Sequence, residues 1–97
     1  MYIAITTVKL IPGSVDTVCN LFKETNPALV QGEEDWVKAS FAADRANDEV
    51  TVMAIWRSAD AYHNFSASTQ FRMTMSKFGP YFAGPPQISV KEILFEM

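Results

Sequence analysis

The stretch Ala54-Ile-Trp-Arg-Ser-Ala-Asp-Ala-Tyr-His-Asn-Phe65 decides the fold predicted for this chain. Its first residues continue an alternating apolar pattern that is typical of a strand, and the strand ends on Trp56. Ser58 follows at once and can cap a helix, because serine accepts a hydrogen bond from the first turn. That helix carries the residues Tyr62, His63 and Phe65. Aromatic side chains and the only histidine therefore meet here, and we expect this stretch to wall any active site.

Upstream of this stretch, hydrophobic periodicity predicts two more strands and one helix. The expected elements are a strand at Tyr2–Leu10, a helix from Ser14 to about Asn26-Pro27, a strand at Asp35–Ala43 and a strand at Glu49–Arg57. Pro12-Gly13 ends the first strand, and residues 28–34 form a loop. The polar residues 44–48 turn the chain between the last two strands, which predicts a hairpin.

Downstream, two short helices and a last strand complete the predicted pattern. Ser58 caps the first short helix, Ser66 or Ser68 begins the second, and Gly79-Pro80 breaks it. The last strand is expected at Gln87–Phe95.

The resulting order β-α-β-β-α-β, with its second helix split, predicts an α+β ferredoxin-like fold as a single domain over residues 1–97. Its four-stranded antiparallel sheet carries helices on one face. Because the other face is also apolar, we expect the sheets of two copies to pair as a homodimer.

Composition narrows the classes of partner. The net charge is −3, and the eight Lys and Arg residues form no basic stripe, so nucleic acid is not an expected partner. No apolar run reaches the roughly 20 residues that span a bilayer, and the N-terminus has no basic leader segment. We therefore expect no membrane partner and a cytoplasmic location. One histidine and one cysteine offer no metal-ligand spacing, and Cys19 lies in the apolar stripe of the first helix, which favours packing.

Several short motifs follow one another along nearly the whole chain. They are Pro12-Gly13 after a strand, the Pro27 shoulder of a helix, Ile55-Trp56-Arg57-Ser58 before a helix, Ser68 with Phe71, and Phe82-Ala83-Gly84-Pro85-Pro86 before the last strand. In this order they resemble the antibiotic biosynthesis monooxygenase family, the dimeric α/β barrels. The resemblance implies the ferredoxin-like fold predicted above and a homodimer that binds a small aromatic molecule.

Activities in the family that this chain resembles differ. They include cofactor-free oxygenation of phenolic or quinol-type substrates and haem degradation, and several members have no settled activity. The first activity implies no cofactor: a deprotonated substrate passes an electron to oxygen, and the protein supplies a dry aromatic pocket and a hydrogen-bond donor. Haem degradation is not expected, because Thr6 and Met75 stand where that branch carries asparagine and the iron-ligating histidine.

Matching by position, the resemblance implies that Tyr62 donates a hydrogen bond to the substrate, and His63 is a candidate base. The predicted pocket residues are Trp56, Phe65, Trp36, Thr6, Phe71, Met75 and Phe78. Other interpretations stay open: the aromatic residues can be core, and His63 can be a solvated side chain. Val52, Ala54 and Phe65 replace polar groups of the oxygenases, which favours a non-catalytic dimeric binding protein as the alternative. A third possibility is an isomerase that uses the same pocket.

Overall fold

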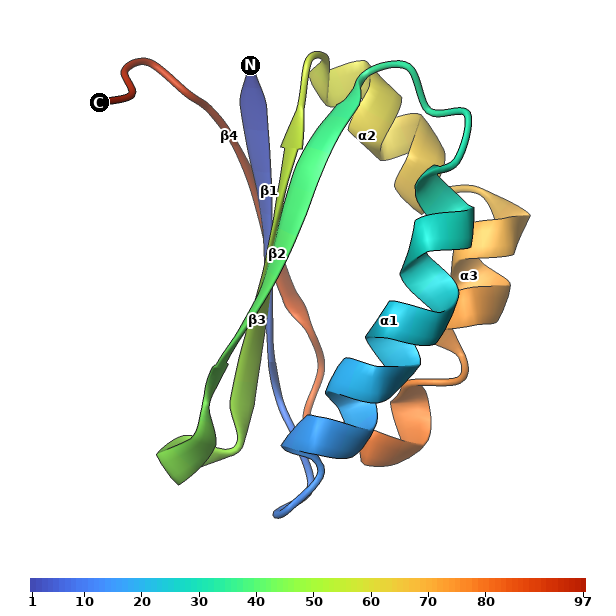
Figure 1. Ribbon diagram of the computed structural model, residues 1–97, viewed down its shortest axis with the longest axis vertical. Helices are drawn as coiled ribbons and strands as arrows, with labels where there is room; N and C mark the ends of the chain where they lie inside the picture. The colour runs from blue at the N-terminus through green and yellow to red at the C-terminus, as the bar shows by residue number, and fades with distance from the viewer.

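Two layers, a sheet and a set of helices, make up the computed structural model, which describes residues 1–97 (Figure 1). The elements in order are β1 (Tyr2–Lys9), α1 (Val15–Val30), β2 (Trp36–Asp44), the 3-10 helix η1 (Arg45–Asn47), β3 (Glu49–Trp56), α2 (Ala59–Ser66), α3 (Thr69–Met75), the 3-10 helix η2 (Gly79–Tyr81) and β4 (Gln87–Glu92). The four strands are antiparallel in the order β2-β3-β1-β4. This confirms the predicted α+β ferredoxin-like fold with a split second helix.

Strand alternation separates a covered face of the sheet from an open one. Thr6 of β1 pairs with Val52 of β3 and with Ile88 of β4, so these three side chains share a face. In Figure 1 the helices α1, α2 and α3 all lie on the side of this face. The residues of opposite parity point the other way, among them Ile5 and Met53, which pair across the two central strands. No element of the chain covers this second face.

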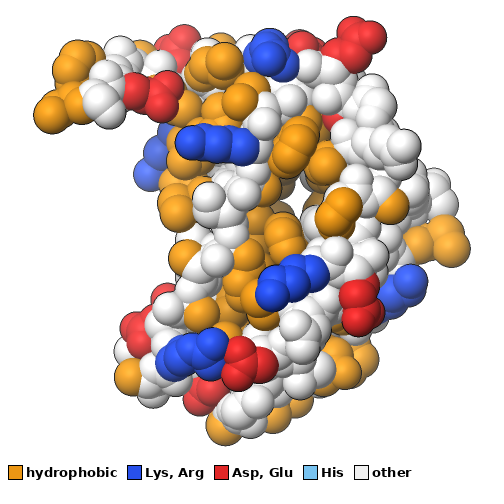
Figure 2. Space-filling view, in the orientation of Figure 1, with side chains coloured by type: hydrophobic (Ala, Val, Ile, Leu, Met, Phe, Trp, Pro, Cys, Tyr) orange, Lys and Arg blue, Asp and Glu red, His pale blue; other side chains and the backbone are white.

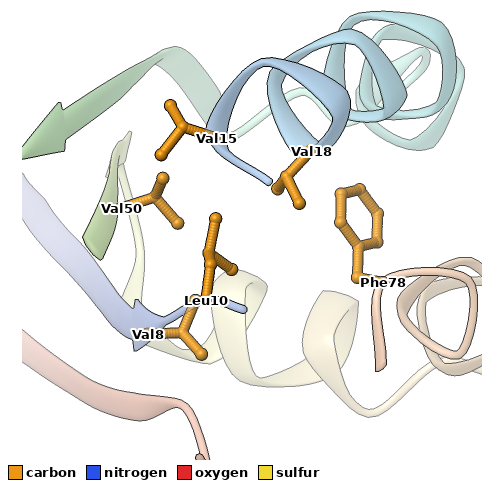
Figure 3. Close-up of a cluster of buried hydrophobic side chains, with 6 residues drawn as sticks. All are labelled: Val8, Leu10, Val15, Val18, Val50 and Phe78. Atoms are coloured by element: carbon orange, nitrogen blue, oxygen red, sulfur yellow. The ribbon is translucent and has the colours of Figure 1, made fainter. Parts of the chain in front are cut away.

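Buried side chains form two clusters on the covered side of the sheet. The larger cluster joins the lower ends of β1 and β3 to α1 and to the segment after α3 (Figure 3). Its members are Val8, Leu10, Val15, Val18, Val50 and Phe78. The smaller cluster lies toward the other end of the strands and contains Ala4, Trp56 and Tyr62. Between the two clusters the sheet and helices are held apart, and this separation positions the site described below.

Serine caps fix the starts of the two short helices. The Ser58 side chain accepts a hydrogen bond from the Ala61 backbone at 3.2 Å, and the Ser68 side chain accepts one from Phe71 at 3.1 Å. Of the two predicted starts of the second short helix, Ser68 is therefore the correct one. Ser14 occupies the N-cap position of α1 but makes no side-chain cap bond, contrary to expectation.

Helix α1 is longer than predicted. It was expected to end near Pro27, but it continues through Pro27 to Val30, so residues 28–30 are not loop. Proline removes one backbone N–H and with it one helical hydrogen bond. Burial of Leu29, which is 5% exposed, offsets that loss and holds the last turn against the sheet. Gly32, with φ of +84°, then lets the chain turn away.

Strand β4 is shorter than predicted. It ends at Glu92 instead of Phe95, and Glu92 pairs with Tyr2, the first residue of its neighbour β1. The Ile93 backbone still donates to the Met1 carbonyl at 2.9 Å, and pairing stops there. Leu94 and Phe95 are consequently exposed, at the chain end that Figure 1 shows standing away from the sheet. No helix has the length and hydrophobicity that crossing a bilayer requires.

Candidate active site

A cavity of about 270 Å³ lies between the sheet and the helices, and we call it the inner cavity. Figure 2 shows the molecule hollowed between these layers, with hydrophobic side chains in the hollow. Its lining residues are Thr6, Val8, Val18, Phe22, Asn26, Phe41, Val50, Val52, Phe71, Met75, Phe78, Phe82, Pro86 and Ile88. Such a small, mainly apolar hollow suits a small apolar or aromatic molecule.

Two side chains bring hydrogen-bonding groups to the inner cavity. Thr6 projects from the central strand β1, where alternation turns its side chain toward the helices between Val52 and Ile88. Asn26 comes from α1, on the other side of the hollow. An otherwise apolar cavity with two placed polar groups binds a ligand through burial and orients it through those groups.

The predicted aromatic wall lies beside the inner cavity and does not line it. Trp56 packs against Phe65 with ring centroids 5.0 Å apart and meets Tyr62 edge-on at 5.9 Å. Trp56 and Tyr62 belong to the smaller buried cluster with Ala4, and Phe65 packs against it. Phe65 also packs against Phe71, with ring centroids 5.2 Å apart, and Phe71 is part of the cavity lining. The cluster therefore supports one wall of the cavity from behind.

The indole of Trp56 contains an unsatisfied polar atom. Trp56 is only 1% exposed, and its Nε1 has no hydrogen-bond partner. A buried donor without a partner costs about 1–3 kcal/mol, and native proteins rarely keep one. The indole N–H group is thus a free hydrogen-bond donor within the aromatic cluster.

Tyr62 links the aromatic cluster to the inner cavity. Burial raises the pKa of its phenol above the usual 10.0, and the nearby side chains of Thr6 and Ser66 partly oppose that rise. Tyr62 is therefore neutral at physiological pH, so its hydroxyl is able to donate a hydrogen bond. Thr6 also lines the cavity and so lies near both the phenol and the hollow.

His63 lies outside the cavity. Its side chain is exposed, and its ring meets that of Tyr62 edge-on with centroids 5.6 Å apart. It is not part of the lining, so a proton can reach it from the cavity only through other groups. Its role as a base stays a prediction.

A second hollow, of about 490 Å³, opens between α1 and β2, and we call it the outer groove. Its lining residues are Phe22, Asn26, Pro27, Val30, Gln31, Trp36 and Ala39. Trp36 reaches it because of a β-bulge between Trp36 and Lys38, which turns Trp36 to the covered face while Lys38 takes the open one. Regular alternation would have placed both on one face.

The inner cavity thus receives four of the predicted pocket residues, namely Thr6, Phe71, Met75 and Phe78. Trp36 lines the outer groove, and Trp56 and Phe65 lie in the neighbouring cluster. Asn26 was not predicted, although a signal existed: it follows Phe22 by four residues and so continues the inward stripe of α1. No group of three or more His, Cys, Asp or Glu side chains converges anywhere in the chain.

Comparison with known structures shows the same fold in several proteins of low sequence identity. A variant of SnoaB, a cofactor-independent oxygenase from Streptomyces nogalater, superposes with a TM-score of 0.81 at 12% identity, covering 99% of this chain and 95% of that one. The protein Rv0793 from Mycobacterium tuberculosis superposes with a TM-score of 0.79 at 15% sequence identity, and the match covers 98% of this chain and 96% of Rv0793. A structure described as an antibiotic biosynthesis monooxygenase superposes with a TM-score of 0.79 at 14% sequence identity, and the match covers 97% of this chain and 99% of the other.

Sequence comparison adds the family. No curated protein sequence matches the chain significantly. The model of the family described as antibiotic biosynthesis monooxygenase matches residues 1–77, which include β1 through α3 and most of the cavity lining. On this match, the chain belongs to the antibiotic biosynthesis monooxygenase family.

Proposed function

We propose that the protein is a monooxygenase that oxidises a small electron-rich aromatic compound, phenolic or quinol-type, without a flavin or metal cofactor. Family membership supports oxygenase chemistry, and one structural neighbour is itself a cofactor-independent oxygenase. The observation that carries the proposal is the inner cavity, whose apolar walls exclude water from a flat ring while the Thr6 hydroxyl offers a contact for one oxygen.

The proposed reaction balances with the substrate as the only reductant. A phenol loses its proton, the phenolate passes one electron to dioxygen, and the two radicals combine at ring carbon to give a hydroperoxide. Loss of water then leaves a quinone, so one oxygen atom enters the product and the other leaves in water. The substrate gives up all four electrons, which is why no external reductant takes part.

In this proposal, the chain acts by burying and orienting the substrate. Thr6 meets the substrate oxygen, and Tyr62 stands behind Thr6 as a neutral phenol that donates a hydrogen bond as charge develops. The unsatisfied Nε1 of Trp56 is a further donor close to Tyr62. His63, exposed beside Tyr62, is the candidate acceptor for the proton that leaves.

A second candidate function is non-catalytic binding of the same kind of molecule. One observation favours it: no residue that lines the inner cavity is titratable, so the cavity itself contains no acid or base. Binding needs only apolar area and the two polar contacts, whereas catalysis also needs a route for the proton.

We also propose that the protein works as a homodimer in which the open faces of two sheets meet. That face carries Ile3, Ile5, Met53 and Ile55, and Met53 is 36% exposed. Hydroxyls of Thr7 and Thr51, 3.1 Å apart, hydrogen-bond to each other within it, and polar residues such as Lys38 and Lys91 stand on the outer strands, so the apolar part of the face is its centre. A second copy, with the same apolar face, is the partner that covers it best. Light scattering after gel filtration tests this: Ile5→Asp should give a monomer, and a wild-type monomer would contradict it.

Oxygen uptake tests the proposed activity. Flavin-free and metal-free protein is mixed with a panel of quinols, anthrones and acidic phenols, and oxygen consumption is compared with that of heat-denatured protein. Thr6→Val keeps the shape of the side chain but removes the hydroxyl, and it should reduce kcat by about tenfold or more. Thr7→Val is the matched control, because Thr7 lies on the opposite face of the same strand and lines neither hollow.

Uptake that is lost in Thr6→Val and kept in Thr7→Val supports the oxygenase. Equal loss in both variants would show a general structural effect instead of a role at the cavity. No uptake with any compound, together with thermal stabilisation of the wild type by some of them, would favour the binding protein.

A further inference from the structure

The inner cavity and the outer groove meet at one turn of α1. Phe22 and Asn26 line both hollows, and no other residue does. They lie four residues apart on the helix, so their side chains are stacked on the same face. These two side chains therefore stand between the outer groove and the inner cavity.

The amide of Asn26 is held in place by a short chain of hydrogen bonds. Its Nδ2 donates to the Thr25 hydroxyl at 3.2 Å, and that hydroxyl donates to the Leu21 carbonyl at 2.8 Å. The carbonyl oxygen of the amide and its second N–H are not engaged in this chain. The amide thus keeps both a donor and an acceptor for a passing or bound molecule.

On the side of Asn26 that faces the inner cavity the walls are almost entirely apolar, whereas the outer groove also contains Gln31. Phe22 stacks against Phe41 of β2 with ring centroids 5.2 Å apart, and Phe41 lines the inner cavity. A fixed amide among aromatic rings discriminates well between ligands that do and do not carry a polar group, because an apolar ligand leaves the amide unpaired.

We propose that ligands enter between α1 and β2 through the outer groove, and that Asn26 selects those aromatic molecules that carry a hydroxyl group. The proposal rests on the proposed function in taking the inner cavity as the ligand site, and it adds the route and the selecting residue. The aromatic body passes along the Phe22 ring, and the hydroxyl is bound by the Asn26 amide at the junction.

Selection is tested with two probes that differ by one hydroxyl, 2-naphthol and naphthalene. Each is titrated into ¹⁵N-labelled protein, and amide shifts report both the affinity and the place of binding. The wild type should bind 2-naphthol about three to ten times more tightly than naphthalene, the range that one net hydrogen bond supplies. Asn26→Leu should bring the ratio to about one, chiefly by tightening naphthalene binding, because no amide is then left unpaired. Asn20→Leu is the matched control, since Asn20 is exposed on the same helix and lines neither hollow.

The route is tested by association kinetics, followed through the fluorescence of 2-naphthol in stopped flow. Ala39 is exposed and lines the outer groove, so Ala39→Trp should slow association by about tenfold or more by filling the entrance. Ala43→Trp is the control: Ala43 is exposed on the same strand and face but lies outside the groove.

The outcomes separate this inference from the proposed function. If 2-naphthol shifts Thr6, Phe71 and Met75 but its preference over naphthalene survives in Asn26→Leu, or if Ala39→Trp binds as fast as Ala43→Trp, the inference fails and the inner cavity stands as the ligand site. If neither probe shifts these residues in the wild type, both the inference and the proposed function fail.

Discussion

Replacing Trp56 by phenylalanine should leave the free energy of unfolding almost unchanged, although Trp56 is among the most buried side chains of the protein. The smaller ring leaves a void of roughly 40 Å³, which destabilises by about 1 kcal/mol at about 24 cal/mol per Å³. The loss of buried apolar area destabilises the folded state by about 1 kcal/mol more. In the other direction, the substitution removes the unsatisfied Nε1 and with it the cost of about 1–3 kcal/mol that an unpaired buried donor adds to the folded state. The opposing effects nearly cancel, and we expect a net change within about 1 kcal/mol.

Urea denaturation followed by circular dichroism measures the difference. Both proteins are compared at one concentration, because association of the folded chain would make the midpoint depend on concentration. Phe78→Leu is the control: Phe78 is 3% exposed and has no polar atom, so its truncation gains nothing and should destabilise by about 1–2 kcal/mol.

A loss above about 3 kcal/mol in Trp56→Phe would refute the reasoning, because it would show that the indole N–H has a partner in solution, such as a buried water. A result near zero, combined with reduced oxygen uptake, would show that the donor is retained for function at the expense of stability.

Substitutions at three further positions have directional outcomes. Above pH 10 the unfolded chain releases the Tyr62 proton while the folded chain keeps it, so the urea midpoint of the wild type should fall with rising pH more steeply than that of Tyr62→Phe. Ser58→Ala removes the cap bond to Ala61 and should lower stability by about 1 kcal/mol, seen as a lower Tm. Asp48 has a φ of 49°, and its side chain accepts a hydrogen bond from the Gly13 backbone at 2.9 Å. Asp48→Val should therefore lower the free energy of unfolding by about 2 kcal/mol, and Asp48→Asn should lower it by less than about 0.5 kcal/mol. Urea denaturation measures both changes.

The fold could be predicted because its signals are local. Alternation along residues 2–10 and 49–57 has the period of a strand, and Ser58 and Ser68 start helices through bonds that span three residues. The errors arose where a distant partner decides the outcome. The turn after Pro27 stays helical because Leu29 is buried, and β4 stops at Glu92, opposite Tyr2, where β1 begins.

The site was predicted less completely for the same reason. Thr6 could be placed, since the parity of a central strand fixes the direction of its side chain. Trp36 could not, because the bulge that redirects it leaves no mark in the hydrophobic pattern. Tyr62 and Trp56 were predicted to wall the cavity, whereas the path of α2 sets them in a cluster beside it. That path depends on packing, which sequence periodicity does not encode.

Pro27 lies in the last part of α1 and lines the outer groove. Having no N–H, it cannot donate to the carbonyl of Lys23, so the final turn is joined to the rest of the helix by one bond fewer. Side-chain burial takes the place of that bond, since Leu29 is only 5% exposed. The edge of the groove at the C-terminal end of α1 is therefore positioned by the packing of one side chain as much as by the hydrogen bonds of the helix.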